Sequence, residues 1–279
     1  MSMNSTELCA KYLKVEKLPT MWCPGCGNGI ILQAILRAVD ESPEAKEKFV
    51  FVSGIGCSAR AVNYMDFDCI HTNHGRAIPF ATGIKMADPS LKVIVLSGDG
   101  DCASIGGNHL IHACRRNIDL TVICMNNSNY GMTGGQFSPT TPVGYQTKTS
   151  VYGSYEPVFD LCRLTESAGA TYVARGATYF PVQMKDMIRK AIAHPGLSFV
   201  DCVSDCPSLF GRLNRLGDAA EMMLRWKDRL VSVRQAEKMS PEELQDKVVW
   251  GEFVNRADRK EYTVVYAENI ARAKESLNE

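Results

Sequence analysis

The chain has 279 residues, 45% of them hydrophobic and 22% charged, and its formal net charge is zero. That length allows one large domain or two small ones with a filled core. A net charge of zero gives no electrostatic support for binding nucleic acid or an anionic membrane surface. No apolar run approaches the ~18–20 residues that a membrane-spanning helix needs. The polar segment 1–18 lacks the apolar centre of a signal peptide, so we expect a cytoplasmic protein.

Eleven cysteines are spread along the chain. Their number is odd and no export signal is visible, so a disulfide framework is not expected. Several lie inside apolar runs, where cysteine is a small buried hydrophobic side chain. The pair Cys23 and Cys26 in "MWCPGCGNG" is different, because it lies between a proline and glycines just before a predicted helix. The pair alone is compatible with a redox disulfide, half of a zinc site or part of an iron–sulfur ligand set.

Five apolar runs are predicted to be buried strands. Their hydrophobicity is continuous, which is typical of parallel strands covered on both faces. These runs are residues 48–53, 91–97, 120–125, 170–175 and 197–203. Helical patterns lie before and between them, at 29–39, 76–87, 104–116, 156–169 and 181–194. The alternation predicts an α/β fold with a mainly parallel sheet and right-handed crossovers.

The end of the chain differs in composition from the rest. Charged, helix-favouring runs such as "EMMLRWKDRL" are typical of residues 215–279. We predict that this part is a helical appendage on an α/β domain formed by residues 1–214, and not an independent domain.

Polar and glycine-rich segments follow four of the predicted strands. They are "GIGCSAR" (54–60), "GDGD" (98–101), "NNSNYGMTGG" (126–135) and "SDCPSLFG" (204–211). In open α/β sheets ligands bind at the carboxyl ends of the strands. These segments therefore predict a binding site along one edge of the sheet.

The segment "GDGD" carries the first candidate metal ligand. Gly98 and Gly100 allow a sharp turn and a close approach to a ligand, and Asp99 lies between them. Gly-Asp-Gly alone is common in ordinary turns. Asn127 follows the next predicted strand, so it should reach the same edge. A carboxylate, an amide oxygen and a backbone carbonyl facing a diphosphate would suit Mg²⁺.

Gly-Asp-Gly followed by Asn-Asn after one helix and one strand resembles the motif of thiamine diphosphate enzymes. The whole run 98–136 is similar, nearly residue for residue, to the β subunit of 2-oxoacid:ferredoxin oxidoreductases, and the resemblance covers about residues 15–215. It implies a thiamine diphosphate-binding fold in which Mg²⁺ is held by Asp99, Asn127 and the carbonyl of Asn129. The positions that it implies for contact with the cofactor are Ile55, Gly56, Cys57, Ser58, His74, Gly98, Gly100, Asp101, Gly131 and Met132.

The same resemblance suggests an answer for the cysteine pair. In that family the β subunit carries one [4Fe–4S] cluster, and the matching ligands are Cys23, Cys26, Cys57 and Cys206. Four thiolates are what a cubane cluster requires. A thioredoxin-like pair would follow a strand, and a zinc ribbon usually has a second Cys-x-x-Cys. The cysteines alone leave zinc and a cluster equally open. Cys202, inside the last predicted strand, is expected to pack in the interior.

The resemblance also implies two catalytic residues. His74 matches a His-Gly-Arg position that lines the cofactor pocket, where it would hydrogen-bond to phosphate or to the reacting group. Arg60 matches a basic position that meets the 2-oxoacid carboxylate, for which a guanidinium is suited. The Gly-, Thr- and Pro-rich loop 130–144 is expected to lie over the cofactor.

The implied reaction is coenzyme A-dependent oxidative decarboxylation of a 2-oxoacid, with electrons passing through the cluster to ferredoxin; the reverse direction is also open. We favour 2-oxoglutarate because the runs 106–122 and 206–214 look most like that subgroup. Pyruvate and branched-chain 2-oxoacids are the alternatives. The glutamate that contacts the aminopyrimidine belongs to a second α/β domain, for which this chain has no room. An α subunit, with γ and δ subunits as further candidates, is therefore the expected partner.

Two other classes of function remain open at this point. One is a non-oxidative thiamine diphosphate enzyme whose cysteines are structural. The other is a zinc-bearing scaffold subunit with a vestigial pocket. A nicotinamide-dependent oxidoreductase is not expected, because no Gly-x-Gly-x-x-Gly opens a strand–helix–strand unit.

Overall fold

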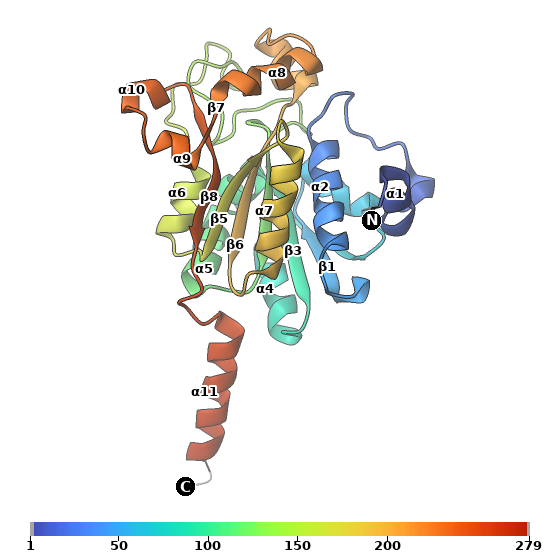
Figure 1. The fold of residues 1–279 in the computed structure, drawn as a ribbon, viewed down its shortest axis with the longest axis vertical. Helices are drawn as coiled ribbons and strands as arrows, with labels where there is room; N and C mark the ends of the chain where they lie inside the picture. Colours follow the sequence, from blue (N-terminus) through green and yellow to red (C-terminus); the bar gives the residue numbers. More distant parts are fainter. Residues whose placement is uncertain (1–2, 278–279) are drawn as a thin grey trace.

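The fold, seen in a computed structural model that describes residues 3–277, is built on one mostly parallel sheet (Figure 1). The order of its strands is β2-β1-β3-β4-β6-β5-β8-β7, and within residues 3–277 only β5 and β8 are antiparallel neighbours in it. The strands are β1 (Phe49–Ser53), β2 (Asp68–His71), β3 (Lys92–Gly98), β4 (Thr121–Asn126), β5 (Tyr172–Ala177), β6 (Ser198–Val203), β7 (Leu230–Ser232) and β8 (Val248–Asn255).

Helices cover both faces of this sheet. On one face lie α2 (Asn28–Asp40) and α7 (Pro181–Ala193), and on the other lie α4 (Ala77–Ala87), α5 (Gly107–Arg116) and α6 (Leu161–Ser167). Alternate strand residues point to opposite faces. Phe51 accordingly packs in the hydrophobic cluster with α2 and α7, whereas its neighbour Val52 packs in the cluster with α4 and α5. The prediction of parallel strands buried on both faces is therefore confirmed.

The remaining helical segments are short or peripheral. The α-helices are α1 (Ser5–Tyr12), α3 (Ala61–Tyr64), α8 (Ala219–Arg229), α9 (Val233–Ala236), α10 (Pro241–Leu244) and α11 (Tyr262–Ser276). The 3₁₀ helices are η1 (Val15–Lys17), η2 (Lys46–Lys48) and η3 (Ser58–Arg60), and the π-helical turns are η4 (Gly100–Ile105) and η5 (Pro207–Gly211). No helix within residues 3–277 is both long and apolar enough to cross a membrane.

All five predicted strands are present, as β1, β3, β4, β5 and β6. The helix predicted at 156–169 is shorter and begins only at Leu161, because the Asp160 side chain caps it by accepting hydrogen bonds from the amides of Cys162 and Arg163. The edge strand β2 was not predicted. It has four residues that are exposed or half-buried, so it lacks a continuous apolar signal.

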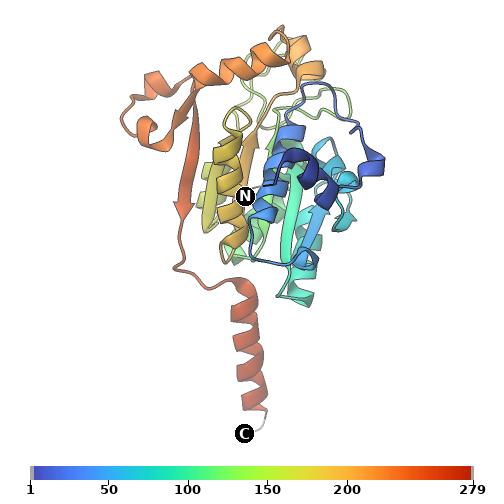
Figure 2. The same cartoon turned by 45° about the vertical axis from the view of Figure 1, so that its right-hand side comes forward.

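The prediction that residues 215–279 are helical is wrong for β7 and β8. The run "VVWGEFVN" is rich in β-branched and aromatic residues, which favour strands. It pairs with β5, and Val254 is buried in the core between sheet and helices. Beyond β8, helix α11 extends away from the sheet in both views (Figures 1 and 2). The boundary at residue 214 stays a prediction.

A buried ion pair lies at the amino end of the sheet, and its contribution to stability can be tested. The ammonium of Lys85, 2% exposed, donates to the carbonyls of Pro89 and Leu91 and lies 2.5 Å from Asp119 Oδ2. Asp119→Asn removes the charge that compensates this buried cation. We expect about 1–3 kcal/mol of destabilisation, seen as a melting temperature lower by a few degrees.

The control is Asp66→Asn, which breaks the more exposed pair with Lys46. Exposed pairs contribute little, so the melting temperature should barely change. Equal shifts in the two variants would contradict this interpretation of Lys85.

Candidate functional site

A small hollow opens at the carboxyl edge of the sheet, above the ends of β1, β3 and β4. Its lining consists of Ile55, Gly56, Cys57, Ser58, His74, Gly98, Asp99, Gly100, Asp101, Met125, Asn127, Asn129, Tyr130, Gly131, Met132 and Thr133. All the positions expected to contact thiamine diphosphate or its metal ion are in this lining. The fold therefore brings the predicted loops together, and their contacts with a cofactor stay predictions.

The carboxylate of Asp101, 3% exposed, ties these loops to one another. Its Oδ1 accepts from the amides of Gly75 at 2.7 Å and Ile55 at 3.3 Å. The same atom lies 2.5 Å from His74 Nδ1, and Oδ2 accepts from the Ser97 hydroxyl at 2.5 Å. Both oxygens are thus used by the protein itself. Asp101 holds the walls of the hollow, a role that the sequence did not reveal.

His74 is oriented by this carboxylate. A carboxylate only accepts, so Nδ1 carries the shared proton and Nε2 is the free nitrogen of the ring. The His74 side chain is 30% exposed and meets the Tyr130 ring edge-on. A half-exposed imidazole with one fixed tautomer can exchange a proton with a ligand in the hollow.

Two glycines permit the close approach of these loops. A Cβ on Gly54 would lie 2.0 Å from Asp101 Oδ2. A Cβ on Gly100 would lie 2.3 Å from the Tyr130 ring, whose hydroxyl donates to the Gly100 carbonyl at 3.0 Å. Any larger residue at either position must displace the site's own groups.

Asp99 is the carboxylate on the floor of the hollow and is 2% exposed. Its Oδ2 accepts from the hydroxyls of Ser138 at 2.5 Å and Thr140 at 2.7 Å. Burial outweighs these hydrogen bonds and raises the pKa of Asp99 to about 6. A cation bound here would favour the ionised carboxylate.

The loop after β4 contains a buried amide oxygen without a partner. Asn129 is 4% exposed, and its Nδ2 donates to the Asn127 carbonyl at 2.8 Å. Its Oδ1 has no hydrogen-bond partner among the described residues. Burying such an atom unpaired costs about 1–3 kcal/mol. The unpartnered atom is the side-chain oxygen, whereas the family resemblance implied the backbone carbonyl. The oxygens of Asp99, Asn127 and Asn129 fit a hard cation such as Mg²⁺.

The loop between β4 and α6 folds back over this floor. Besides Ser138 and Thr140, the Thr141 hydroxyl donates to the Ser128 carbonyl at 2.7 Å. Residues 130–144 were predicted to cover the cofactor, but no pattern identified which hydroxyls bond to Asp99. The only available signal was the cluster "SPTT" itself.

The four candidate cluster cysteines lie near one another at the same edge. The Gly27 amide donates to the Asp205 carbonyl at 3.2 Å, and Trp22 Nε1 donates to the Cys57 carbonyl at 2.8 Å. These bonds join the Cys-x-x-Cys loop to the segments that carry Cys206 and Cys57.

The titration of these thiols reflects their proximity. Burial raises the pKa of Cys26 to about 12, and the charges of Cys206, Cys57 and Cys23 act in the same direction. Burial likewise raises the pKa of Cys57 to about 11, with further contributions from Cys206 and Cys23. Thiolates at such positions need a positively charged partner.

Within residues 3–277 no three His, Cys, Asp or Glu side chains are grouped tightly enough to hold a single metal ion. A cubane cluster separates its thiolates more widely than one ion does, so the cluster assignment stays a prediction. Cys202 is fully buried in the hydrophobic core, as predicted, and Cys206 lies at the edge and is 9% exposed.

Arg60 lies outside the lining of the hollow, on η3. Burial and the nearby guanidinium of Arg60 lower the pKa of His71. Arg60 is therefore close to Cys57 and His71, and its contact with a substrate carboxylate stays a prediction.

Comparisons with known proteins agree with this geometry. Residues 54–202 match the family described as "Thiamine pyrophosphate enzyme, C-terminal TPP binding domain". The chain is 50% identical over 246 residues to 2-oxoglutarate synthase subunit KorB of Methanothermobacter thermautotrophicus, covering 88% of this chain and 86% of that protein. It is 47% identical over 189 residues to the 2-oxoacid:ferredoxin oxidoreductase subunit beta of Saccharolobus solfataricus, covering 67% of this chain and 62% of the relative.

The chain belongs to the β subunits of the 2-oxoacid:ferredoxin oxidoreductases.

A solved structure supports the same conclusion for the fold. The 2-oxoglutarate:ferredoxin oxidoreductase from Magnetococcus marinus, with 2-oxoglutarate, coenzyme A and succinyl-CoA bound, superimposes with a TM-score of 0.82 at 32% identity. The match covers 97% of this chain and 90% of that chain. The thiamine diphosphate-binding α/β fold is thereby confirmed, and a β subunit implies further subunits of a complex.

The glycine beside Asp101 provides a test of the walls of this β subunit's hollow. Gly54→Ala should push the Asp101 carboxylate away and release the His74 loop. We expect the assembled complex to retain thiamine diphosphate at least about tenfold more weakly, as measured by gel filtration followed by cofactor analysis.

Gly83→Ala in α4 is the matched control, because a Cβ there meets nothing within 4 Å. It should retain the cofactor as the wild type does. Normal retention by Gly54→Ala would show that Asp101 does not shape the cofactor site.

Proposed function

We propose that this β subunit binds the diphosphate end of thiamine diphosphate through Mg²⁺ held by Asp99, Asn127 and Asn129. The buried Asn129 Oδ1 without a partner supports this assignment, as does the buried carboxylate of Asp99. Ile55, Gly56, Ser58, Gly98, Gly100, Gly131 and Met132 would then surround the cofactor. Bound thiamine diphosphate supplies the electron sink for loss of carbon dioxide from a 2-oxoacid.

The same proposal assigns one [4Fe–4S] cluster to Cys23, Cys26, Cys57 and Cys206. The observation that carries the proposal is the double position of Cys57. It lines the hollow and also belongs to the cysteine group. A Cβ added to Gly131, which also lines the hollow, would lie 3.4 Å from Cys57 Sγ. An electron acceptor bound by Cys57 would adjoin the reacting centre. That arrangement suits an oxidation whose electrons leave one at a time.

Two further residues of this chain would act on the substrate, His74 in proton transfer and Arg60 in carboxylate binding. Asp101 fixes the His74 ring, so that Nε2 can hold or accept a proton at the reacting end of the hollow. Arg60 would meet the 2-oxoacid carboxylate by paired hydrogen bonds. The glutamate against the aminopyrimidine would come from the α subunit, with γ and δ subunits as further candidate members of the complex.

The substrate that we favour is 2-oxoglutarate. It would be converted with coenzyme A to succinyl-CoA and carbon dioxide, with two electrons passing through the cluster to ferredoxin; the reverse reaction is also open. Support comes from a relative named 2-oxoglutarate synthase and from a structural neighbour that binds 2-oxoglutarate and coenzyme A. We infer the cytoplasm as the compartment, because the four thiols must stay reduced until the cluster assembles.

The substrate is tested by assaying the assembled complex with ferredoxin on a panel of 2-oxoglutarate, pyruvate and branched-chain 2-oxoacids. We expect 2-oxoglutarate to give the highest kcat/KM, and the β subunit alone to give no turnover. Full activity of the single chain would contradict the shared site. Decarboxylation without reduction of ferredoxin would favour a non-oxidative enzyme.

The two cofactor sites are tested separately by Asp99→Ala and Cys206→Ser. Asp99→Ala should lose thiamine diphosphate but keep iron and the broad absorbance of the cluster near ~400 nm. Cys206→Ser should lose that absorbance and the electron transfer to ferredoxin, but retain thiamine diphosphate.

Metal analysis of the anaerobic wild-type complex is the accompanying measurement. Zinc in place of iron would favour a scaffold role. Loss of both cofactors in both variants would show that the two sites are not separable.

A further inference from the structure

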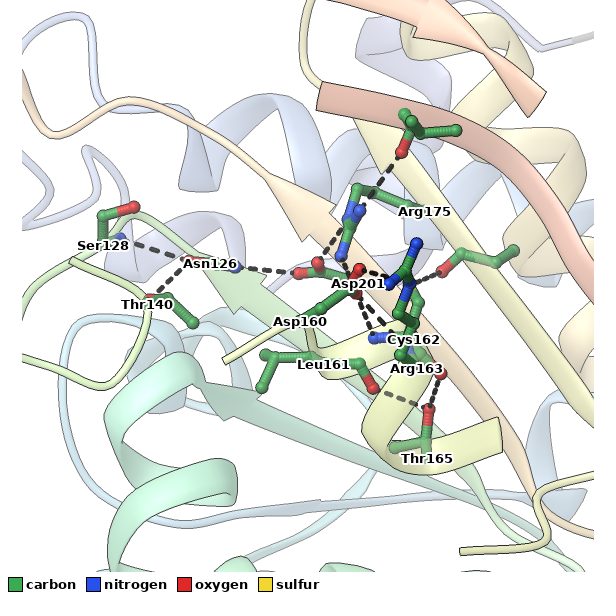
Figure 3. A network of polar contacts seen from close by, with 12 residues as sticks. Asn126, Ser128, Thr140, Asp160, Leu161, Cys162, Arg163, Thr165, Arg175 and Asp201 are labelled. Carbon is green, nitrogen blue, oxygen red and sulfur yellow. Dashed lines mark hydrogen bonds and ion pairs between the residues drawn. The ribbon is translucent and has the colours of Figure 1, made fainter. Parts of the chain in front are cut away.

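A buried polar network runs from the end of β4 to the C-terminal strand β8 (Figure 3). Its centre is Asp201 on β6, which is 1% exposed. Asp201 Oδ1 accepts from Asn126 Nδ2 at 3.0 Å, and Oδ2 accepts from Arg175 Nε at 2.8 Å. Asn126 immediately precedes the candidate magnesium ligand Asn127. The network therefore contacts the candidate metal-binding loop 126–129 at its first residue, Asn126.

Arg175 uses all three nitrogens of its guanidinium. Besides Asp201, it donates to Asp160 Oδ1 at 2.7 Å and to the Val249 carbonyl of β8 at 3.2 Å. Burial favours the neutral form of Asp160, but the Arg175 charge outweighs it and holds the pKa of Asp160 below its usual range. Arg175 is 8% exposed, so its position is fixed from three sides. It fixes Asp201 in turn.

The charge of Asp201 determines how the Asn126 amide is oriented. A carboxylate can only accept, so the Asn126 NH₂ group must face Asp201. Asn126 Oδ1 is then turned toward the loop, where it accepts from the Ser128 amide at 3.2 Å and lies 3.0 Å from the Thr140 hydroxyl. The same Thr140 hydroxyl lies 2.7 Å from Asp99. The Thr140 hydroxyl, which has one proton to donate, thus lies between the Asn126 amide at the end of β4 and the carboxylate of Asp99 after β3.

This orientation matters because the loop is strained. Ser128 has a φ of +60°, which is uncommon for residues other than glycine. The hydrogen bond from the Ser128 N–H to Asn126 Oδ1 holds this turn. Asn127 and Asn129 lie on either side of Ser128 in the turn. With the Asn126 amide reversed, an NH₂ group would face the Ser128 N–H, and the turn would lose its support.

We propose that Asp201, held by Arg175, is a positioning residue for the metal-binding loop 126–129. The proposal rests on the magnesium site proposed above. Asp201 lies outside the lining of the hollow and would act through Asn126. Because Arg175 also bonds to β8, the C-terminal segment takes part in shaping the cofactor site.

The test uses Asp201→Asn in the assembled complex. The new amide has nearly the same shape, but Arg175 Nε only donates and therefore holds its oxygen. Its NH₂ group then faces Asn126 and favours the reversed Asn126 amide. We expect the Mg²⁺ concentration for half-maximal retention of thiamine diphosphate to rise about tenfold. Activity at saturating Mg²⁺ should recover most of the wild-type kcat. Arg175→Lys, which keeps the charge but not three donors in a fixed fork, should raise the half-saturating concentration severalfold.

Asp119→Asn is the matched control, because it breaks a buried ion pair at the opposite end of β4. It should lower the melting temperature and leave the Mg²⁺ dependence unchanged. If Asp201→Asn and Arg175→Lys also lower only the melting temperature, the positioning role is overturned and the magnesium site stands. If Asp201→Asn does not assemble, an unchanged Mg²⁺ dependence in Arg175→Lys overturns the role by itself. Retention by the wild type that does not depend on Mg²⁺ would instead overturn the magnesium site on which the inference rests.

Discussion

The arrangement of the site depends on the buried carboxylate of Asp101, which accepts hydrogen bonds from segments that are far apart in the sequence. It joins the loop after β1, the turn before α4 and the end of β3. Parallel strands bring these segments to one edge but do not fix the distances between them. The carboxylate does so, and Gly54 provides the space for it. The geometry of His74 follows from the same contact.

Much of the fold could be predicted because its signals are local. The continuous apolar runs of β1, β3, β4, β5 and β6 are visible in the sequence, and so are the glycines and carboxylates that follow them. The short exposed strand β2 and the late strand β8 gave weaker signals. The apolar run of β8 lies among charged helical segments, and β8 runs antiparallel to its neighbour β5. No local sequence pattern predicts that β8 pairs with β5.

The network beneath the metal-binding loop shows a different limit. Arg175 and Asp201 are charged residues inside apolar strands, which is a readable anomaly. Their contact depends on register, because they are direct partners across β5 and β6. It also depends on strand order, since β6 lies between β4 and β5 although β5 comes first in the chain. Order and register are properties of the assembled sheet. The hydroxyls that bond to Asp99 are likewise placed by a long loop that has no regular pattern.

The strands at the two edges of the sheet determine how easily another chain can pair with it. The outermost strands are β2, with four residues, and β7, with three, whereas the longer β5 is covered by β8. Long open strands recruit other chains through their unpaired backbone groups, and very short ones offer little to recruit. Edges of this kind offer few unpaired backbone groups to another chain, and β7 covers β8 over Val248–Trp250. The antiparallel return of the chain as β8 thus leaves β5 without an open edge.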